Sequence, residues 1–145
     1  MNKERAEQIT LTLMRVVAGL LFMMHGAAIL FGWFGGMPGA PKVQLMSQTG
    51  IGGILEFFGG ILIMLGLVTR VVAFILSGTM AVAYFQFHQP MGMNPIQNHG
   101  EPAVLFCFLF LYLVARGAGV YSFDALFARN RTDRTMPTGR PAVQL

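Results

Sequence analysis

The sequence predicts an all-α integral membrane protein that folds as a four-transmembrane-helix bundle. Of its 145 residues, 54% are hydrophobic and only 11% are charged, whereas about 25% of the residues in an ordinary soluble domain are charged. The apolar residues gather into four stretches, at about 9–34, 51–68, 71–87 and 102–117. Because backbone polar groups find no water inside a bilayer, each stretch is expected to form a helix.

Each stretch fits one crossing of a bilayer, which takes about 20 residues, or about 17 at the short end. The first is longer than the roughly 7–15 apolar residues of a signal peptide, so we expect it to be retained. A tight turn at Thr69-Arg70 joins the second and third spans. The apolar core of the fourth, Pro102 to Val114, is short and must include flanking residues. Residues 1–127 are therefore expected to form one transmembrane domain.

Basic residues predict the orientation of the bundle. They are Lys3, Arg5, Arg15, Arg70, Arg116, Arg129, Arg131, Arg134 and Arg140. With four spans, all of them fall on one side of the membrane, which the positive-inside rule assigns to the cytoplasm. Both termini are thus expected to be cytoplasmic. The loops 35–50 and 88–101 contain Lys42 as their only basic residue and are expected to lie outside. Residues 128–145 are predicted to be a basic, disordered cytoplasmic tail.

Charge and cysteine content exclude two kinds of function. The formal net charge is +4, but the cations lie where membrane topology requires them, so nucleic-acid binding is not expected. The single cysteine, Cys107, excludes an internal disulfide and two-thiol exchange within this chain. A redox role would therefore need a cofactor or a partner.

Four polar side chains fall at a similar depth in the predicted spans. They are His25, Glu56, Tyr84 and Glu101. Glu56 and Tyr84 each lie 14 residues from Arg70, which is roughly 21 Å at a helical rise of about 1.5 Å per residue. Ionisable groups within a membrane tend to mark function. We therefore expect a polar site in the outer half of the bundle, with His88 and Asn98 at its mouth.

Several chemistries fit this set of residues. Two carboxylates and two histidines have the ligand types of a metal site between helices, and these weak candidates are His25, Glu56, His88 and Glu101. No compact His/Glu motif supports a metal. A quinone-like ligand also fits, because histidine and glutamate exchange protons with carbonyls and Tyr84, Phe85 and Trp33 offer an aromatic wall. A buried polar network that only holds the helices together remains an alternative.

Three arginines form a second polar layer, near the predicted inner interface. They are Arg15, Arg70 and Arg116. Snorkelling, contact with lipid phosphates or a role in helix packing accounts for arginines at this depth.

Short motifs in the chain resemble those of the DoxX family of four-span membrane proteins. The matching motifs are Leu20-Leu21-Phe22 with His25-Gly26, Gly53-Ile54-Leu55-Glu56-Phe57-Phe58-Gly59-Gly60, Gly66-Leu67-Val68-Thr69-Arg70, Ala83-Tyr84-Phe85 with His88, Asn98-His99-Gly100-Glu101, and Arg116-Gly117-Ala118-Gly119 with Tyr121-Ser122 and Asp124. The family's frequent Asn-Gly-Gly-Glu is replaced here by Asn98-His99-Gly100-Glu101, which adds a titratable histidine beside the predicted site.

The resemblance implies a four-helix bundle in the bacterial cytoplasmic (inner) membrane and a link to redox metabolism, as in thiosulfate:quinone oxidoreductase subunits. We therefore expect a subunit of a redox-linked membrane complex that binds a quinone or a similar small redox ligand. Its partners would be membrane lipids and other membrane or peripheral redox subunits. Whether the chain takes part in catalysis stays open, because a non-enzymatic accessory subunit fits the same motifs.

In the ligand-binding interpretation, each candidate residue has a role. His25 and Glu56 would handle protons or hydrogen bonds, and Tyr84 and His88 would orient the ligand. Asn98 and Glu101 would close the pocket from the outer loop.

Overall fold

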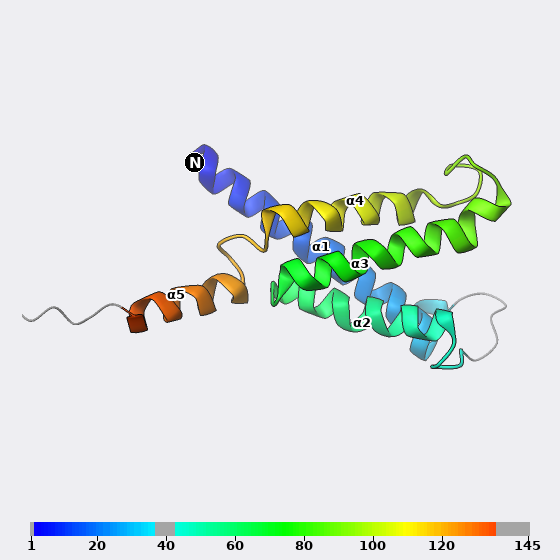
Figure 1. Cartoon of the computed structure of the whole chain (residues 1–145), viewed down its shortest axis with the longest axis horizontal. Helices are drawn as coiled ribbons and strands as arrows, with labels where there is room; N and C mark the ends of the chain where they lie inside the picture. The colour runs from blue at the N-terminus through cyan, green and yellow to red at the C-terminus, as the bar shows by residue number, and fades with distance from the viewer. Residues whose placement is uncertain (1, 37–42, 136–145) are drawn as a thin grey trace, which may run out of the picture.

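The computed structural model describes residues 2–36 and 43–135, with side chains as far as Arg131, and these residues form helices and turns without a strand (Figure 1). The long helices are α1 Lys3–Phe31, α2 Gln48–Leu65, α3 Thr69–Ala83, α4 Glu101–Arg116 and α5 Phe123–Thr135. A 3-10 turn, Trp33–Gly35, follows α1. A π-helical turn, Tyr84–His88, and a 3-10 turn, Gln89–Met91, extend α3.

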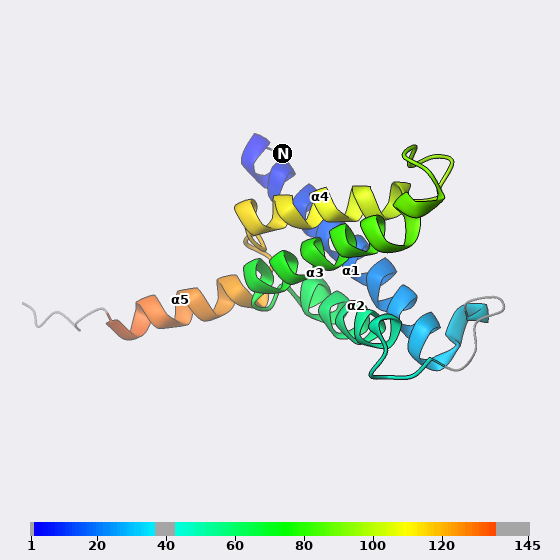
Figure 2. The same ribbon diagram turned by 45° about the vertical axis from the view of Figure 1, so that its right-hand side comes forward.

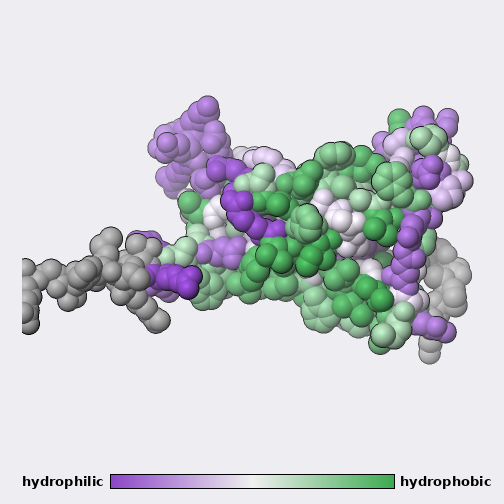
Figure 3. Space-filling model, in the orientation of Figure 1, coloured by the Kyte–Doolittle hydropathy of each residue, from purple (hydrophilic) through white to green (hydrophobic). Residues whose placement is uncertain are grey.

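Three helices within the described residues are long and apolar enough to cross a membrane. They are Lys3–Phe31, Gln48–Leu65 and the continuous segment Thr69–Met91. Helix α4 is also apolar but has only 16 residues. Apolar side chains cover the middle of the molecule and polar side chains gather at its two ends (Figure 3), as expected for a protein that lies across a bilayer.

Local capping explains where the helices begin and end. The side chains of Asn2 and Ser47 accept hydrogen bonds from the backbone N–H groups of Arg5 and Gly50, which caps the first turns of α1 and α2. Gly32 ends α1 in the left-handed conformation, with φ 69°. Pro90 lacks a backbone N–H and cannot continue an α-helix, and the segment before it changes to π-helical geometry.

Helices α1 to α4 lie in the four predicted apolar stretches in the same order, but their ends differ by several residues. Helix α1 begins at Lys3 rather than at residue 9, because the Asn2 cap lies outside the apolar run. Helix α4 begins within one residue of its predicted start. Lys42 and Arg140 lie outside the described residues, as does the side chain of Arg134.

The C-terminal segment differs most from the prediction. Residues 128–135, expected to be disordered, continue helix α5, which starts at Phe123. Composition alone missed this helix because its helix-forming features lie at its start. Asp124 stands in the first turn, where a carboxylate is favourable, and Phe127 follows Phe123 at i+4 spacing with a ring contact of 6.3 Å. Residues 136–145 lie outside the described part of the chain.

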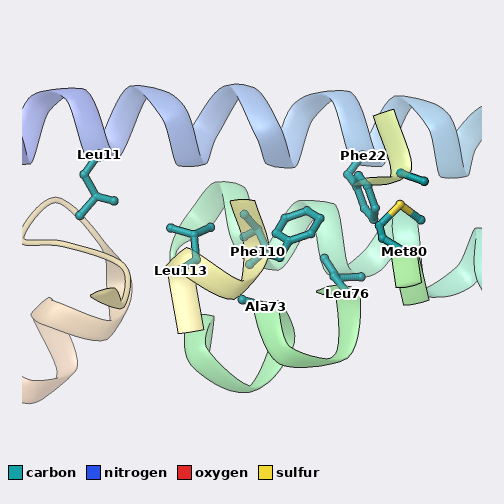
Figure 4. Packing of buried hydrophobic residues seen from close by; sticks show 9 residues of the cluster. Leu11, Phe22, Ala73, Leu76, Met80, Phe110 and Leu113 are labelled. Atoms are coloured by element: carbon teal, nitrogen blue, oxygen red, sulfur yellow. The ribbon is translucent and has the colours of Figure 1, made fainter. Parts of the chain in front are cut away.

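The four helices α1 to α4 pack as two pairs, α1 with α2 and α3 with α4 (Figures 1 and 2). Apolar side chains between the pairs form the core (Figure 4). Phe22 of α1 meets Phe110 of α4 edge to face, with ring centroids 4.7 Å apart, and lies 5.0 Å from Phe106. This contact joins the first helix to the last helix of the bundle.

Glycines allow α1 and α2 to touch along their backbones. A Cβ atom at Gly60 would lie 2.5 Å from the backbone N of Met23, and one at Gly19 would lie 2.6 Å from the carbonyl oxygen of Gly60. A Cβ atom at Gly26 would lie 2.4 Å from the backbone N of Phe57. Gly52 has open space around it, so on α2 the contact runs through Gly53 and Gly60. Small residues commonly allow such close contact between membrane helices.

One end of the bundle, which we call the basic end, holds the N-terminus, the α2–α3 turn and residues 116–125 (Figure 1). Its central group is Arg15, which is only 1% exposed. Its Nη1 donates to the carbonyl oxygens of Ile63 and Met64, each at 2.6 Å, and its Nη2 donates to Tyr121 O at 2.8 Å. The guanidinium therefore caps the C-terminus of α2, where helical carbonyls lack partners.

Two further groups complete the basic end. The carboxylate of Asp124 accepts from the backbone N–H groups of Val68 and Thr69, at 2.7 and 2.9 Å, and so caps the start of α3. Arg70 donates through Nη1 to the carbonyls of Val114 and Ala115, which lie in the last turn of α4. Charged side chains thus cap three helix ends that meet at one level of the bundle.

The glycine contact predicts opposite outcomes for two similar substitutions. Gly60→Ala should lower the unfolding temperature, because the new methyl group must push α1 and α2 apart. Gly78→Ala, where a Cβ meets no atom within 4 Å, should keep or raise that temperature, because alanine favours a helix by about 1 kcal/mol over glycine. Thermal unfolding in detergent, followed by circular dichroism, compares the two variants. Equal effects would contradict the backbone contact.

Replacing Arg15 should destabilise the whole bundle. In Arg15→Met the side chain keeps most of its length, but the carbonyls of Met64 and Tyr121 lose the Arg15 donor and that of Ile63 keeps only the N–H of Gly66, at about 1–3 kcal/mol for each buried group left unsatisfied. Arg5→Met is the control, since Arg5 is exposed. The same unfolding measurement should show a large decrease for Arg15→Met and little change for Arg5→Met. A small decrease for both would show that the cap contributes little.

Candidate functional site

The predicted outer-half site contains one direct contact between ionisable side chains. Nδ1 of His25, on α1, lies 2.7 Å from Oε2 of Glu56, on α2. The Glu56 side chain is only 6% exposed, whereas that of His25 is 56% exposed. The pair therefore connects a buried carboxylate to an imidazole at the surface of the bundle, and a proton can be shared between them.

The glycine contact positions this pair. His25 and Glu56 are direct sequence neighbours of Gly26 and Phe57, whose backbones touch. A buried carboxylate is costly unless it is paired, and the close approach of the two helices places the imidazole within hydrogen-bond distance of it.

Aromatic side chains gather where the C-terminal end of α1 meets α2. Phe31 lies 5.3 Å from Phe57 and 5.2 Å from Trp33, measured between ring centroids, and Phe57 lies 5.2 Å from Phe58. Phe31, Trp33 and Phe58 are each more than half exposed. The exposed faces of these rings offer a surface on which a flat apolar ligand can stack.

A second polar group closes the turn between α3 and α4. Asn98, 1% exposed, donates from Nδ2 to Gly92 O at 2.7 Å and accepts at Oδ1 from Gly100 N at 2.8 Å. Nδ1 of His88 lies 3.0 Å from Asn98 O, so it donates to that carbonyl. The Tyr84 ring stacks near His88, and its hydroxyl donates to Met93 O at 3.3 Å.

The structure therefore places five of the six candidate residues in two groups and leaves Glu101 apart from both. Within the described residues, no hydrogen bond or ring contact joins the His25–Glu56 pair to the group of Tyr84, His88 and Asn98. Glu101 is exposed at the first position of α4. The described part of the chain contains no group of three or more His, Cys, Asp or Glu side chains placed to hold a metal, so the four weak metal candidates do not converge there.

Sequence reasoning missed one contact between the two helix pairs at this end. The side chains of Gln48, at the start of α2, and Gln86, in the π-helical turn, form a hydrogen bond. Neither residue was a candidate, because Gln48 precedes the second apolar stretch and Gln86 stands at the end of the third, where an uncharged side chain is not unusual. The bond ties the start of α2 to the segment that carries Tyr84 and His88.

The apolar surface, the paired helices and the polar groups inside them define a multi-pass helical membrane protein. Comparison with known proteins assigns its family. The family model described as DoxX matches residues 10–89. An uncharacterized protein of Haemophilus influenzae is 39% identical over 129 residues, which cover 87% of this chain and 96% of that protein.

The chain belongs to the DoxX family, which confirms the resemblance carried by its motifs. Inner membrane protein YqjF of Escherichia coli is 27% identical over 132 residues, which cover 85% of this chain and 95% of that protein. No solved structure matches the chain. The protein is thus a multi-pass DoxX-family protein of the bacterial inner membrane.

The loop group predicts a local effect of substitution. Asn98→Ala should loosen the turn between α3 and α4, because two backbone groups lose their side-chain partner, at about 0.5–1.5 kcal/mol per hydrogen bond. The expected result is faster proteolysis between residues 88 and 100 with little change in overall helix content. Gln97→Ala, at an exposed neighbouring position, should leave the rate unchanged. Equal rates for the two variants would contradict a structural role of Asn98.

Proposed function

We propose that the protein binds a quinone, or a similar small redox-active ligand, beside the His25–Glu56 pair and serves as a subunit of a redox-linked membrane complex. The proposal includes four membrane spans, with α4 as the fourth and both termini in the cytoplasm. The observation that carries it is the 2.7 Å contact between an exposed imidazole and a buried carboxylate.

The topology has support in the distribution of charge. Arg70 and Arg116 lie at the end of the bundle that also holds the N-terminus and the start of α5. An even number of spans places these cations on one side, as the positive-inside rule requires. Helix α4 packs along α3 over its length, and residues beyond its two ends are available to complete a crossing.

The chemistry of the pair suits a quinone. Reduction of a quinone to a quinol adds two electrons and two protons, and each carbonyl oxygen becomes a hydroxyl. His25 faces the surface, so it can hydrogen-bond to such an oxygen and pass it a proton. The Glu56 carboxylate stabilises the protonated imidazole, which takes a new proton from water at the membrane surface after each transfer, so that two transfers supply both protons. The electrons come from a redox-active partner, since Cys107 is the only cysteine of the chain.

The surroundings of His25 support a flat ligand of this class. The rings of Phe31, Trp33 and Phe58 are exposed at the same α1–α2 interface. A quinone dissolved in the bilayer reaches this surface laterally, without passing through water. In this proposal Tyr84, His88 and Asn98 shape the neighbouring outer turn, and Glu101 stands at its edge.

A non-enzymatic accessory subunit is the second candidate function. It is favoured by the position of the pair at the tightest contact of α1 and α2, where a hydrogen bond between side chains also stabilises helix association. In that case the pair has a purely structural role, and the exposed apolar faces contact neighbouring subunits.

Ligand binding separates the two functions. We expect a short-chain ubiquinone or menaquinone analogue to raise the unfolding temperature of the detergent-purified protein. We expect His25→Ala to remove most of this increase, because the ligand loses its hydrogen-bond donor. His99→Asn is the matched control, since His99 is exposed and its positive φ of 57° is tolerated by asparagine.

Two results would decide against quinone binding. One is the absence of both co-purified quinone and any thermal shift in the wild-type protein. The other is an equal shift in wild type and His25→Ala. If Glu56→Gln and His25→Ala lower the unfolding temperature of the free protein while no ligand binds, the accessory function is supported instead.

A further inference from the structure

The three arginines of the basic end have different surroundings. The guanidinium of Arg15 is buried and caps α2, and Arg70 uses Nη1 to cap α4. Arg116, in the last turn of α4, is exposed. Among the described residues its guanidinium has no hydrogen-bond or ion-pair partner, so its charge remains available to a ligand.

Two hollows open on either side of Arg116. The first, of about 370 Å³, is lined by Arg5 and Arg116 but also by Glu4 and Glu7, so its formal charges balance. The second, of about 410 Å³, contains Arg70, Arg116 and a single carboxylate, that of Asp124. Only the second hollow has an excess of positive charge.

The one carboxylate of the second hollow is already engaged. Both oxygens of Asp124 accept hydrogen bonds from backbone N–H groups, those of Val68 and Thr69. It therefore offsets the two guanidinium groups less than a free carboxylate would. The positive charge of this hollow favours an anion.

The position of Arg70 suits an anion of phosphate size. Its two bonds to the α4 carbonyls fix the guanidinium, while Nε and Nη2 lie beside Gly117. A Cβ atom at Gly117 would be 3.4 Å from both nitrogens, so the glycine keeps the space in front of them open. Guanidinium N–H groups match the oxygens of a phosphate in geometry as well as in charge.

Apolar side chains at the edge of the hollow favour a lipid, rather than a free anion, as the source of the phosphate. Val68 and Val71, which line it, are more than half exposed, as is Val120 nearby. The hollow thus combines exposed apolar side chains with the charged groups of the basic end, as a site at the level of lipid headgroups requires. A lipid can place its phosphate between the arginines and its acyl chains along the valines.

We propose that this hollow binds the phosphate of an anionic phospholipid. A zwitterionic lipid also carries a phosphate, but its own ammonium group competes with the arginines. A basic pocket between helices near the membrane surface is a recognised type of lipid-headgroup site. A bound lipid here would bridge the start of α3 and the end of α4, the two elements that Arg70 already connects.

Native mass spectrometry of the delipidated full-length protein tests the proposal, with phosphatidylglycerol and phosphatidylcholine of identical acyl chains as probes. We expect phosphatidylglycerol to bind more tightly. Arg116→Gln should weaken its binding roughly fivefold, the typical contribution of one basic residue near an anionic lipid, whereas Arg116→Lys should retain most of it. Arg129→Gln is the control, because Arg129 is exposed on α5 and lines neither hollow.

Three results would overturn the assignment. They are equal binding of the two lipids, an equal effect of Arg116→Gln and Arg129→Gln, and displacement of the lipid by inorganic phosphate at low millimolar concentration, which would indicate a small-anion site. Circular dichroism checks that Arg116→Gln is folded. If it is not, the preference of the wild-type protein between the two lipids decides the question.

Discussion

The fold depends on a charged group that is buried within an apolar helix, the guanidinium of Arg15. Arg15 lies near the middle of α1 and is only 1% exposed, and its two terminal nitrogens donate to the carbonyls at the end of α2 and to that of Tyr121. These bonds fix the level of α2 relative to α1. They also hold residues 119–124 against the bundle, which places Asp124 where it caps α3.

The position of the candidate site follows from this alignment. Once Arg15 sets the level of α1 against α2, Gly19 meets Gly60 and Gly26 meets Phe57 further along the same interface. The backbones then approach closely enough for His25 to reach Glu56. The polar pair at one end of the interface and the polar cap at its other end are thus two consequences of the same helix packing, and a shift of one turn would break both.

Apolar content predicted the helices well, because each span must satisfy its backbone internally whatever its neighbours are. Rotation about the helix axis was harder to predict. Gly52, Glu56 and Gly60 recur every four residues, a spacing that turns by about 40° with each step, whereas a seven-residue step returns to within about 20° of its start. The observed contacts use the seven-residue spacing, with Gly19 and Gly26 facing Gly53 and Gly60. Glu56 is nevertheless buried, because Gly53 and Gly60 on either side of it pack against α1.

Depth along a helix is a weaker guide to surroundings than the place of a residue relative to the helix ends. Glu56 and Glu101 have similar predicted depths, yet Glu56 lies mid-helix against α1, while Glu101 opens α4 and is exposed. The arginines follow the same rule. Arg15 is mid-helix and must be satisfied inside the protein, whereas Arg116 stands at a helix end and keeps its charge free for a ligand. The buried polar residues Arg15 and Glu56 therefore specify the packing of this bundle, whereas Glu101 and Arg116, at the two ends of α4, are exposed.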